Sequence, residues 1–73
     1  MTFAENLKML RKQAGMSQEQ LAEKLGVSRQ AVTKWETGAG IPDIENIMAI
    51  SMLFDISIDD LLSNERDSKK VVE

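Results

Sequence analysis

Four polar side chains in one short segment have the chemistry needed to read the edges of nucleic-acid bases. They are Arg29, Gln30, Thr33 and Lys34, at spacings that place them on one side of a helix. An arginine can pair with guanine O6 and N7, a glutamine can pair with adenine N6 and N7, and a threonine methyl can contact the thymine methyl. A polar helix face is also what a merely solvated surface looks like, so the interpretation needs a second observation.

That observation is the charge at the start of the same helix, which we expect over residues 28–37. Ser28 is its predicted N-cap, and Val32 and Trp35 face inward. The other four expected helices carry an acidic residue in their first turn, whereas this one opens with Arg29 and has no acid before Glu36. A cation at an exposed helix N-terminus costs about 0.3–1 kcal/mol. Because contact with bases or phosphate would remove this cost, the pattern predicts a DNA-contacting helix.

Five helices are expected along the chain, and each has a start signal. The predicted N-caps are Thr2, Ser17, Ser28, Asp43 and Ser57, with capping boxes formed by Thr2 and Glu5 and by Ser17 and Gln20. Gly15, Gly26 and the segment 38–42 separate the helices. Apolar residues recur at helical spacing, and packing is the expected role of Met9, Met48 and Met52. The predicted fold class is all-α.

The second and third helices have the pattern of a helix-turn-helix unit. Seven positions carry it: Leu21, Ala22, Leu25, Gly26, Val27, Val32 and Trp35. Ala22 is small enough for two helices to touch at a steep angle. Gly26 can adopt the positive φ that the short turn needs without a steric penalty.

With these motifs, the chain resembles the phage repressor/Cro family, also called the xenobiotic-response-element family. The resemblance extends from Phe3 to Leu62 and includes the segments 17–22, 27–32 and 35–38, Pro42, and the segment 58–62. It implies a five-helix, repressor-like DNA-binding domain whose third helix enters the major groove of an operator. It also implies a transcriptional regulator, a repressor in most cases, that acts as a dimer.

The resemblance and the helix starts together assign further roles. Backbone phosphate contacts are expected from Ser17, Gln18, Ser28, Thr37 and Gly38, of which Gln18 matches the family's phosphate-gripping position at the start of the second helix. Support of the recognition helix is expected from Arg11, Glu36, Ala22, Gly26, Val32 and Trp35. Within this set, the family joins the first helix to the end of the third through the pair Arg11 and Glu36.

The charge of the chain is unevenly distributed. Residues 1–36 carry six basic and four acidic side chains, whereas residues 42–64 carry five acidic side chains and no basic one. Although the overall charge is −3, residues 1–36 have a net positive charge and can therefore contact phosphate. Uneven charge that serves only solvation would look the same, so this observation does not decide between the two interpretations.

Length and composition limit the other possibilities. The 73 residues contain no cysteine and no histidine, so a disulfide framework, a Cys/His zinc site and imidazole catalysis are excluded, and no cofactor is expected. No apolar run approaches the ~18 residues that span a bilayer, and the N-terminus lacks a secretory pattern. We expect a cytoplasmic protein without membrane contact, with one domain over residues 1–64 and a flexible tail or linker over residues 65–73.

The sequence argues against two other function classes and predicts one assembly. An enzyme is disfavoured because Asp59 and Asp60 are adjacent and face different directions, and because Ser17 and Ser28 have no imidazole to activate them. A protein-interaction module that has lost DNA contacts should carry apolar or acidic residues in place of the four base-reading candidates, and this sequence has no such residue at those positions. A homodimer through the fifth helix and the end of the fourth is predicted from apolar residues that one small core cannot hide: Met52, Phe54, Ile56, Ile58, Leu61 and Leu62, with Val71 and Val72 further on.

Overall fold

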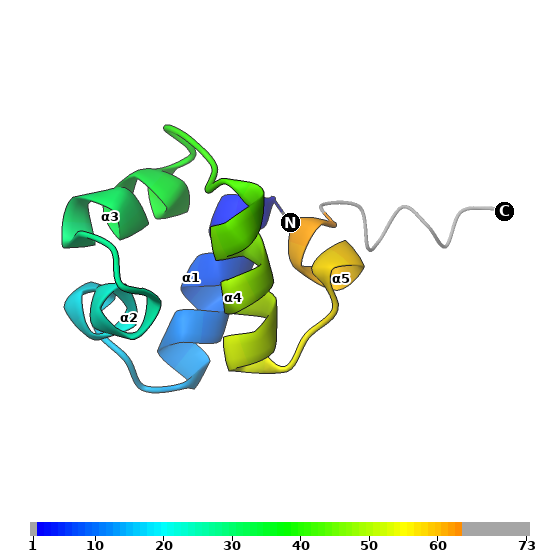
Figure 1. Cartoon of the computed structure of the whole chain (residues 1–73), viewed down its shortest axis with the longest axis horizontal. Coiled ribbons are helices and arrows are strands. Elements are labelled where there is room, and N and C mark those ends of the chain that lie inside the picture. The colour runs from blue at the N-terminus through cyan, green and yellow to red at the C-terminus, as the bar shows by residue number, and fades with distance from the viewer. Residues whose placement is uncertain (1, 64–73) are drawn as a thin grey trace, which may run out of the picture.

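The computed structural model describes residues 2–63, and their regular secondary structure is entirely helical. The five helices are α1 (Phe3–Gln13), α2 (Gln18–Leu25), α3 (Arg29–Thr37), α4 (Ile44–Phe54) and α5 (Ile58–Leu62). Helix α3 packs against both α2 and α1, while α5 packs against α1 and α4 (Figure 1). The α2–α3 pair thus lies at one end of the domain and α5 at the other. The all-α, five-helix prediction is confirmed.

Each helix begins at the residue that the sequence predicts. The five N-cap residues have extended backbones, and each side chain accepts a hydrogen bond from an amide of its first turn: Thr2, Ser17, Ser28, Asp43 and Ser57. The capping boxes of α1 and α2 are complete, because the side chains of Glu5 and Gln20 accept from the Thr2 and Ser17 amides in return. Local side-chain chemistry therefore sets the start of each helix.

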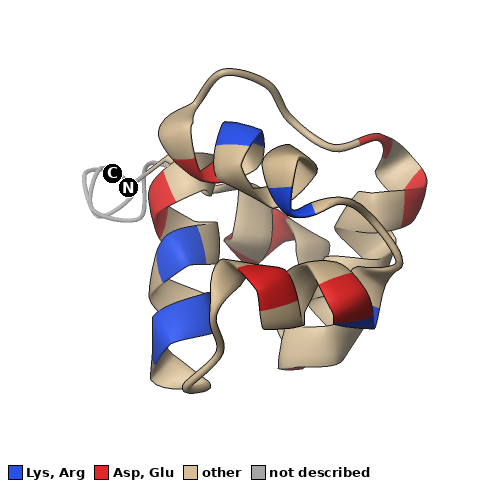
Figure 2. Ribbon diagram, turned by 90° about the vertical axis from the view of Figure 1, so that its left-hand side faces the viewer, with Lys and Arg blue, Asp and Glu red and all other residues tan. Residues whose placement is uncertain are grey.

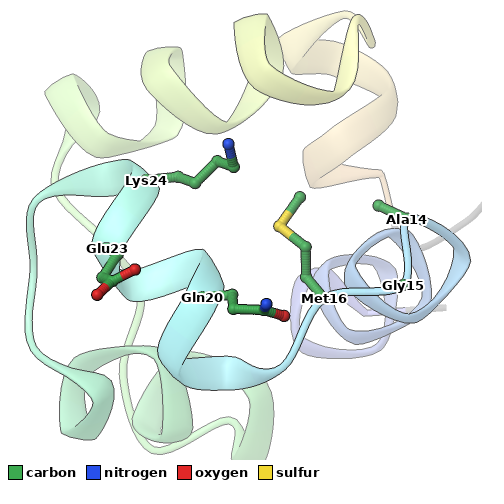
Figure 3. A pocket seen from close by; sticks show the side chains of 6 residues that line it. All are labelled: Ala14, Gly15, Met16, Gln20, Glu23 and Lys24. Atoms are coloured by element: carbon green, nitrogen blue, oxygen red, sulfur yellow. The ribbon is translucent and has the colours of Figure 1, made fainter.

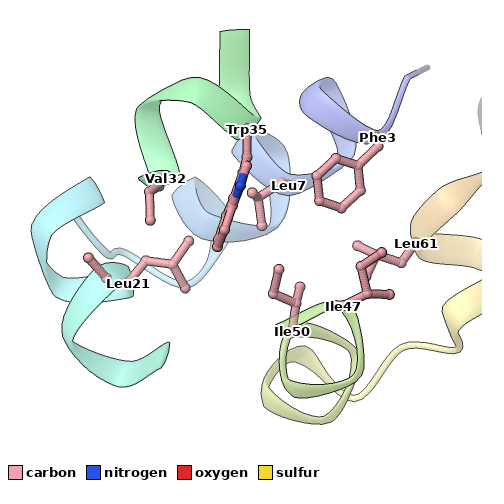
Figure 4. Packing of buried hydrophobic residues seen from close by; sticks show 9 residues of the cluster. Phe3, Leu7, Leu21, Val32, Trp35, Ile47, Ile50 and Leu61 are labelled. Carbon is pink, nitrogen blue, oxygen red and sulfur yellow. The ribbon is translucent and has the colours of Figure 1, made fainter. Parts of the chain in front are cut away.

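All five helices contribute to a single core. Leu7, Leu21, Val32, Ile50 and Leu61 are completely buried. The Trp35 ring stands between Leu21 and Val32 on one side and Phe3 and Leu7 on the other (Figure 4). Trp35 is therefore a packing residue that attaches α3 to the rest of the domain, as its spacing predicts.

A buried polar contact attaches α5 to α1. The Asn6 side chain is only 2% exposed, and its Nδ2 donates to the carbonyl oxygens of Leu61 at 2.9 Å and Ser63 at 2.8 Å. These carbonyls lie at the C-terminal end of α5, where a helix leaves acceptors without intrahelical donors. Among the described residues, Oδ1 of Asn6 is the one buried side-chain polar atom without a hydrogen-bond partner. Asn6 thus acts as a C-terminal cap supplied by a different helix.

The outer face of α4 carries exposed apolar side chains, most of which the sequence does not predict. Ile44 and Met48 are 60% and 48% exposed and Met52 is 78% exposed, so the expectation that Met48 and Met52 pack inside is wrong. The exposure of Met52 agrees instead with its place among the apolar residues that the core cannot hide. Their spacing is helical, but Ile47 and Ile50 occupy the inward face of α4. Exposed apolar side chains thus form a row along one side of this helix.

Over residues 2–63, no helix is both long enough and apolar enough to cross a membrane. The tail predicted over residues 65–73, including Val71 and Val72, lies outside the described residues.

Candidate nucleic-acid interface

The α2–α3 pair has the geometry expected of a helix-turn-helix unit. Ala22 is 3% exposed at the contact between the helices, and the Val27 amide donates to its carbonyl at 3.0 Å. Gly26 ends α2 in the left-handed conformation, with φ of 72°. A residue with a Cβ would be strained there, so the turn depends on glycine. Ala22 and Gly26 thus shape the contact and the turn between α2 and α3, and their support of DNA recognition stays a prediction.

Helix α3 turns a polar surface outward. Arg29, Gln30, Thr33 and Lys34 together line one surface hollow. Arg29, Gln30 and Lys34 are exposed and Thr33 is half-buried, whereas Val32 and Trp35 are buried on the opposite side of the helix. The structure therefore brings together all four side chains to which the sequence assigns base contacts.

The charge pattern of the helix starts is also as predicted. Helix α3 has no acidic residue in its first turn, whereas α1, α2, α4 and α5 each have at least one. On the face that carries α2 and α3, basic segments lie on α1, on α3 and at the end of α2, while acidic segments lie on α2 and at the start of α1 (Figure 2). Basic and acidic residues are thus mixed on this face, and α3 differs from α1 and α2 by lacking an acid in its first turn.

The end of α3 is attached to α1 by a buried ion pair. Arg11 donates through Nε to Oε2 of Glu36 at 2.6 Å and through Nη2 to Oε1 at 3.0 Å. A third donor atom, Nη1, reaches the Met16 carbonyl at 2.8 Å in the turn before α2. The hydrogen bond with Glu36 raises the pKa of Arg11, burial opposes this, and the attraction between the two charges adds to it. The pair that the family resemblance implies is therefore present, in bidentate form.

The carboxylate of Glu36 has a further partner that sequence reasoning missed. Nε2 of Gln18 donates to Oε1 of Glu36 at 3.0 Å, and Oε1 of Gln18 accepts from the Thr33 hydroxyl at 2.8 Å. A single glutamine at the start of α2 thus bridges two residues of α3. Polar residues 15 and 18 positions apart carry no mutual signal in a lone sequence, so nothing in the pattern indicated this contact.

The remaining predicted phosphate-contacting residues lie at helix ends. Ser17 and Ser28 are N-caps, which accept from the amides of Gln20 and Ala31. At the other end of α3, the Thr37 hydroxyl donates to the Lys34 carbonyl at 3.2 Å. Gly38 ends the helix in the left-handed conformation, with φ of 82°. These side chains thus have structural roles, and their contacts with DNA stay predictions.

Another surface hollow is separate from the α3 surface. It is lined by Ala14, Gly15, Met16, Gln20, Glu23 and Lys24, which come from the end of α1, the following turn and α2 (Figure 3). Its lining includes the exposed side chains of Glu23, Lys24 and Gln20 and shares no residue with the hollow over α3. We assign it no ligand.

The sequence matches the helix-turn-helix family over residues 7–61, which is most of the chain. The chain belongs to this family. Among curated relatives, it is 51% identical over 65 residues to the HTH-type transcriptional activator BcrR of Enterococcus faecalis, covering 89% of this chain and 32% of that protein. It is 38% identical over 61 residues to the cryptic phage CTXphi transcriptional repressor RstR of Vibrio cholerae, covering 84% of this chain and 54% of that one. The chain thus spans about a third to a half of the length of these two relatives.

Solved structures show the same architecture. The phage P22 c2 repressor in complex with a synthetic operator superposes with a TM-score of 0.83 at 31% sequence identity, covering 89% of this chain and 98% of the repressor chain. The biofilm regulator SinR in complex with DNA superposes with a TM-score of 0.77 at 30% identity, covering 85% of this chain and all of that one. The family assignment and the repressor-like fold predicted from the sequence are confirmed.

Proposed function

We propose that this chain binds double-stranded DNA sequence-specifically, as the DNA-binding part of a transcriptional regulator that acts as a repressor. Helix α3 would enter the major groove, with Arg29, Gln30, Thr33 and Lys34 toward base edges. The observation that supports this most is the α3 surface itself, where these four side chains line one hollow on a helix that begins with an uncompensated cation. The P22 c2 repressor and SinR, both solved with DNA, share the fold that presents this surface.

Phosphate contacts are proposed for the residues at the ends of α2 and α3. Ser17 and Gln18 lie at the N-terminus of α2. The free backbone N–H groups of this first turn and the helix dipole favour binding of an anion. Ser28, Thr37 and Gly38 lie at the two ends of α3 and would follow the backbone on either side of the groove. We also propose a cytoplasmic location, where such a regulator would meet its operator.

The decisive experiment is selection of bound sites from random duplex DNA with the purified chain. We expect a defined site to be enriched, and we expect Arg29→Ala to relax the preference at one base pair of that site. Lys24→Ala, on the exposed side of α2, is the matched control that removes a cation without touching the α3 surface. If no sequence is enriched and affinity for bulk DNA is absent at low salt, the chain is a protein-interaction module and the proposal is wrong.

We further propose that the chain binds its site as a homodimer through α5 and the end of α4. One recognition helix covers only a few base pairs, so two half-sites about one helical turn apart are needed for useful specificity. Met52, Leu53 and Leu62 supply exposed apolar surface in this region, at 78%, 36% and 41% exposure. Leu61 is completely buried, and Phe54, Ile56 and Ile58 pack partly against the core, so these four contribute to the fold first.

Sedimentation of the free protein and of its complex with a selected site tests the dimer. We expect two protomers on a palindromic site, and we expect Leu62→Glu to weaken assembly while leaving the helical content unchanged. Ile41→Glu, which also places a charge on an exposed apolar residue but before α4, is the control. A monomer at tens of micromolar that binds a non-palindromic site one-to-one would contradict the dimer without contradicting DNA binding.

A further inference from the structure

The side-chain amide of Gln18 is held in one orientation by its two partners on α3. Its oxygen accepts from the Thr33 hydroxyl at 2.8 Å, and its nitrogen donates to the carboxylate of Glu36 at 3.0 Å. An ionised carboxylate can only accept, so the nitrogen of the amide must face Glu36 and the oxygen must face Thr33. Arg11 in turn fixes the carboxylate by two hydrogen bonds. The orientation of Gln18 thus follows from a chain of bonds that begins in α1.

Counting hydrogens shows what this arrangement leaves available. A primary amide has two N–H groups, and Glu36 takes one of them. The second N–H of Gln18 is on a half-buried side chain at the first position of α2, beside the free amides of the helix N-terminus. We assign this N–H to a phosphate oxygen seated at that terminus, and the bonds to Thr33 and Glu36 fix the orientation of the amide before DNA arrives.

Thr33 has two chemically different groups with different surroundings. Its hydroxyl is used by Gln18, whereas the residue also lines the hollow with Arg29, Gln30 and Lys34. Rotation of the side chain to turn the hydroxyl toward a base would break the hydrogen bond to Gln18. The donor hydrogen of the hydroxyl therefore belongs to the contact between α2 and α3, and we assign the methyl to the base-facing surface.

We propose that Thr33 is a positioning residue: its hydroxyl, together with Glu36, orients the Gln18 amide toward the DNA backbone and so joins the phosphate grip of α2 to the reading surface of α3. The inference rests on the proposed DNA-binding function and adds to it a residue whose hydroxyl acts through another side chain. It predicts that the hydroxyl and the methyl of Thr33 have separable effects on binding.

Two substitutions separate these groups. Thr33→Val keeps the shape and a methyl but removes the hydroxyl, while Thr33→Ser keeps the hydroxyl and removes the methyl. For Thr33→Val we expect affinity for the selected site and for random duplex to fall alike, by about three- to tenfold, the effect of one neutral hydrogen bond. Thr33→Ser should bind random duplex within about twofold of the parent, and in both variants the salt dependence should be unchanged because no charge is altered.

A double substitution tests whether the hydroxyl acts through Gln18. If it does, Gln18→Ala combined with Thr33→Val should bind random duplex no more weakly than Gln18→Ala alone. Urea unfolding of each variant shows whether a loss of affinity merely follows a loss of fold. In the free protein, the NMR signals of the Gln18 side-chain amide should shift in Thr33→Val and keep their parent positions in Thr33→Ser, which tests the hydrogen bond without DNA.

Three results would overturn the inference. One is a Thr33→Val variant that changes the preference at one base pair but keeps its affinity for random duplex, because the hydroxyl would then read a base. The second is an additive loss in the double variant, and the third is an unchanged Gln18 amide signal in Thr33→Val. If the parent chain itself binds no duplex while the amide signal shifts as expected, the proposed function fails and the hydrogen-bond network stands.

Discussion

Replacing Glu36 by methionine removes the acceptor of the ion pair that joins α1 to α3. The Arg11 and Glu36 side chains are only 10% and 2% exposed, so the variant leaves a guanidinium largely out of water with the Met16 carbonyl as its remaining protein partner. Removing one partner of a buried pair costs about 3–5 kcal/mol, whereas an exposed pair contributes only about 0–1 kcal/mol. Because the guanidinium retains some contact with water, we expect about 3 kcal/mol, at the lower end of the buried range.

This loss is large for so small a domain. At about 0.05–0.15 kcal/mol per residue, a chain of this length has a free energy of unfolding of about 4–11 kcal/mol. Glu36→Met should therefore remove at least a quarter of it. Urea unfolding at neutral pH, followed by far-UV circular dichroism, measures the change directly.

A double-mutant cycle distinguishes the ion pair from general packing. Arg11→Met should be destabilising as well, because it leaves the carboxylate of Glu36 buried beside a single neutral donor, Gln18. The double variant should recover much of the loss, since an apolar pair of similar volume replaces two buried charges. Glu23→Met, at an exposed position of α2, is the control and should stay within about 0.5 kcal/mol of the parent. Single-variant losses below about 1 kcal/mol would refute the reasoning, because the pair would then behave as an exposed one.

Three further predictions concern separate parts of the chain. Arg29→Ala and Gln30→Ala should each cost about 1–3 kcal/mol of binding free energy on the preferred site, with little change in random-duplex affinity or thermal stability; equal losses on both DNAs would show that they do not read sequence. Asn6→Ala should destabilise the fold by about 1–3 kcal/mol in urea unfolding, because it strips a donor from two carbonyls at the end of α5; an unchanged stability would mean that water replaces the donor. Gly26→Ala should cost about 1–2 kcal/mol through backbone strain alone, since nothing lies within 4 Å of the added Cβ; a loss well above this range in the same assay would indicate a clash instead.

The local features of this fold could be predicted because each depends on neighbouring residues. An N-cap serine or threonine binds amides two or three residues away, so the residues 17–20 alone predict where α2 begins. A left-handed backbone conformation favours glycine, so the glycine at position 26 predicts the turn that ends α2. Inward-facing positions such as Val32 and Trp35 follow from helical spacing. Helical spacing also predicts that the four base-reading candidates lie together, because they are the polar positions on the outward side of one helix.

The face of α4 could not be predicted in the same way. Apolar residues lie around most of the circumference of α4, among them Ile44, Ile47, Met48 and Ile50. Their spacing therefore does not indicate which side of the helix is buried in the core. The arrangement of α1, α2 and α5 decides it, by placing the core against Ile47 and Ile50. Ile44 and Met48 are consequently exposed, although the sequence alone gives them the same pattern.

The partners of Gln18 were beyond prediction because the contact exists only once two helices cross. Within α2, this residue reads as a polar first-turn position, and within α3, Thr33 reads as part of a polar face. The crossing that Ala22 and Gly26 permit brings them to 2.8 Å, and the same carboxylate that holds Arg11 then holds the amide. Stability and the geometry of the proposed interface therefore share Glu36. A change at that residue should lower both the free energy of unfolding and the affinity for every duplex, whereas a change at Arg29, which is exposed at the start of α3, should affect only the affinity for the selected site.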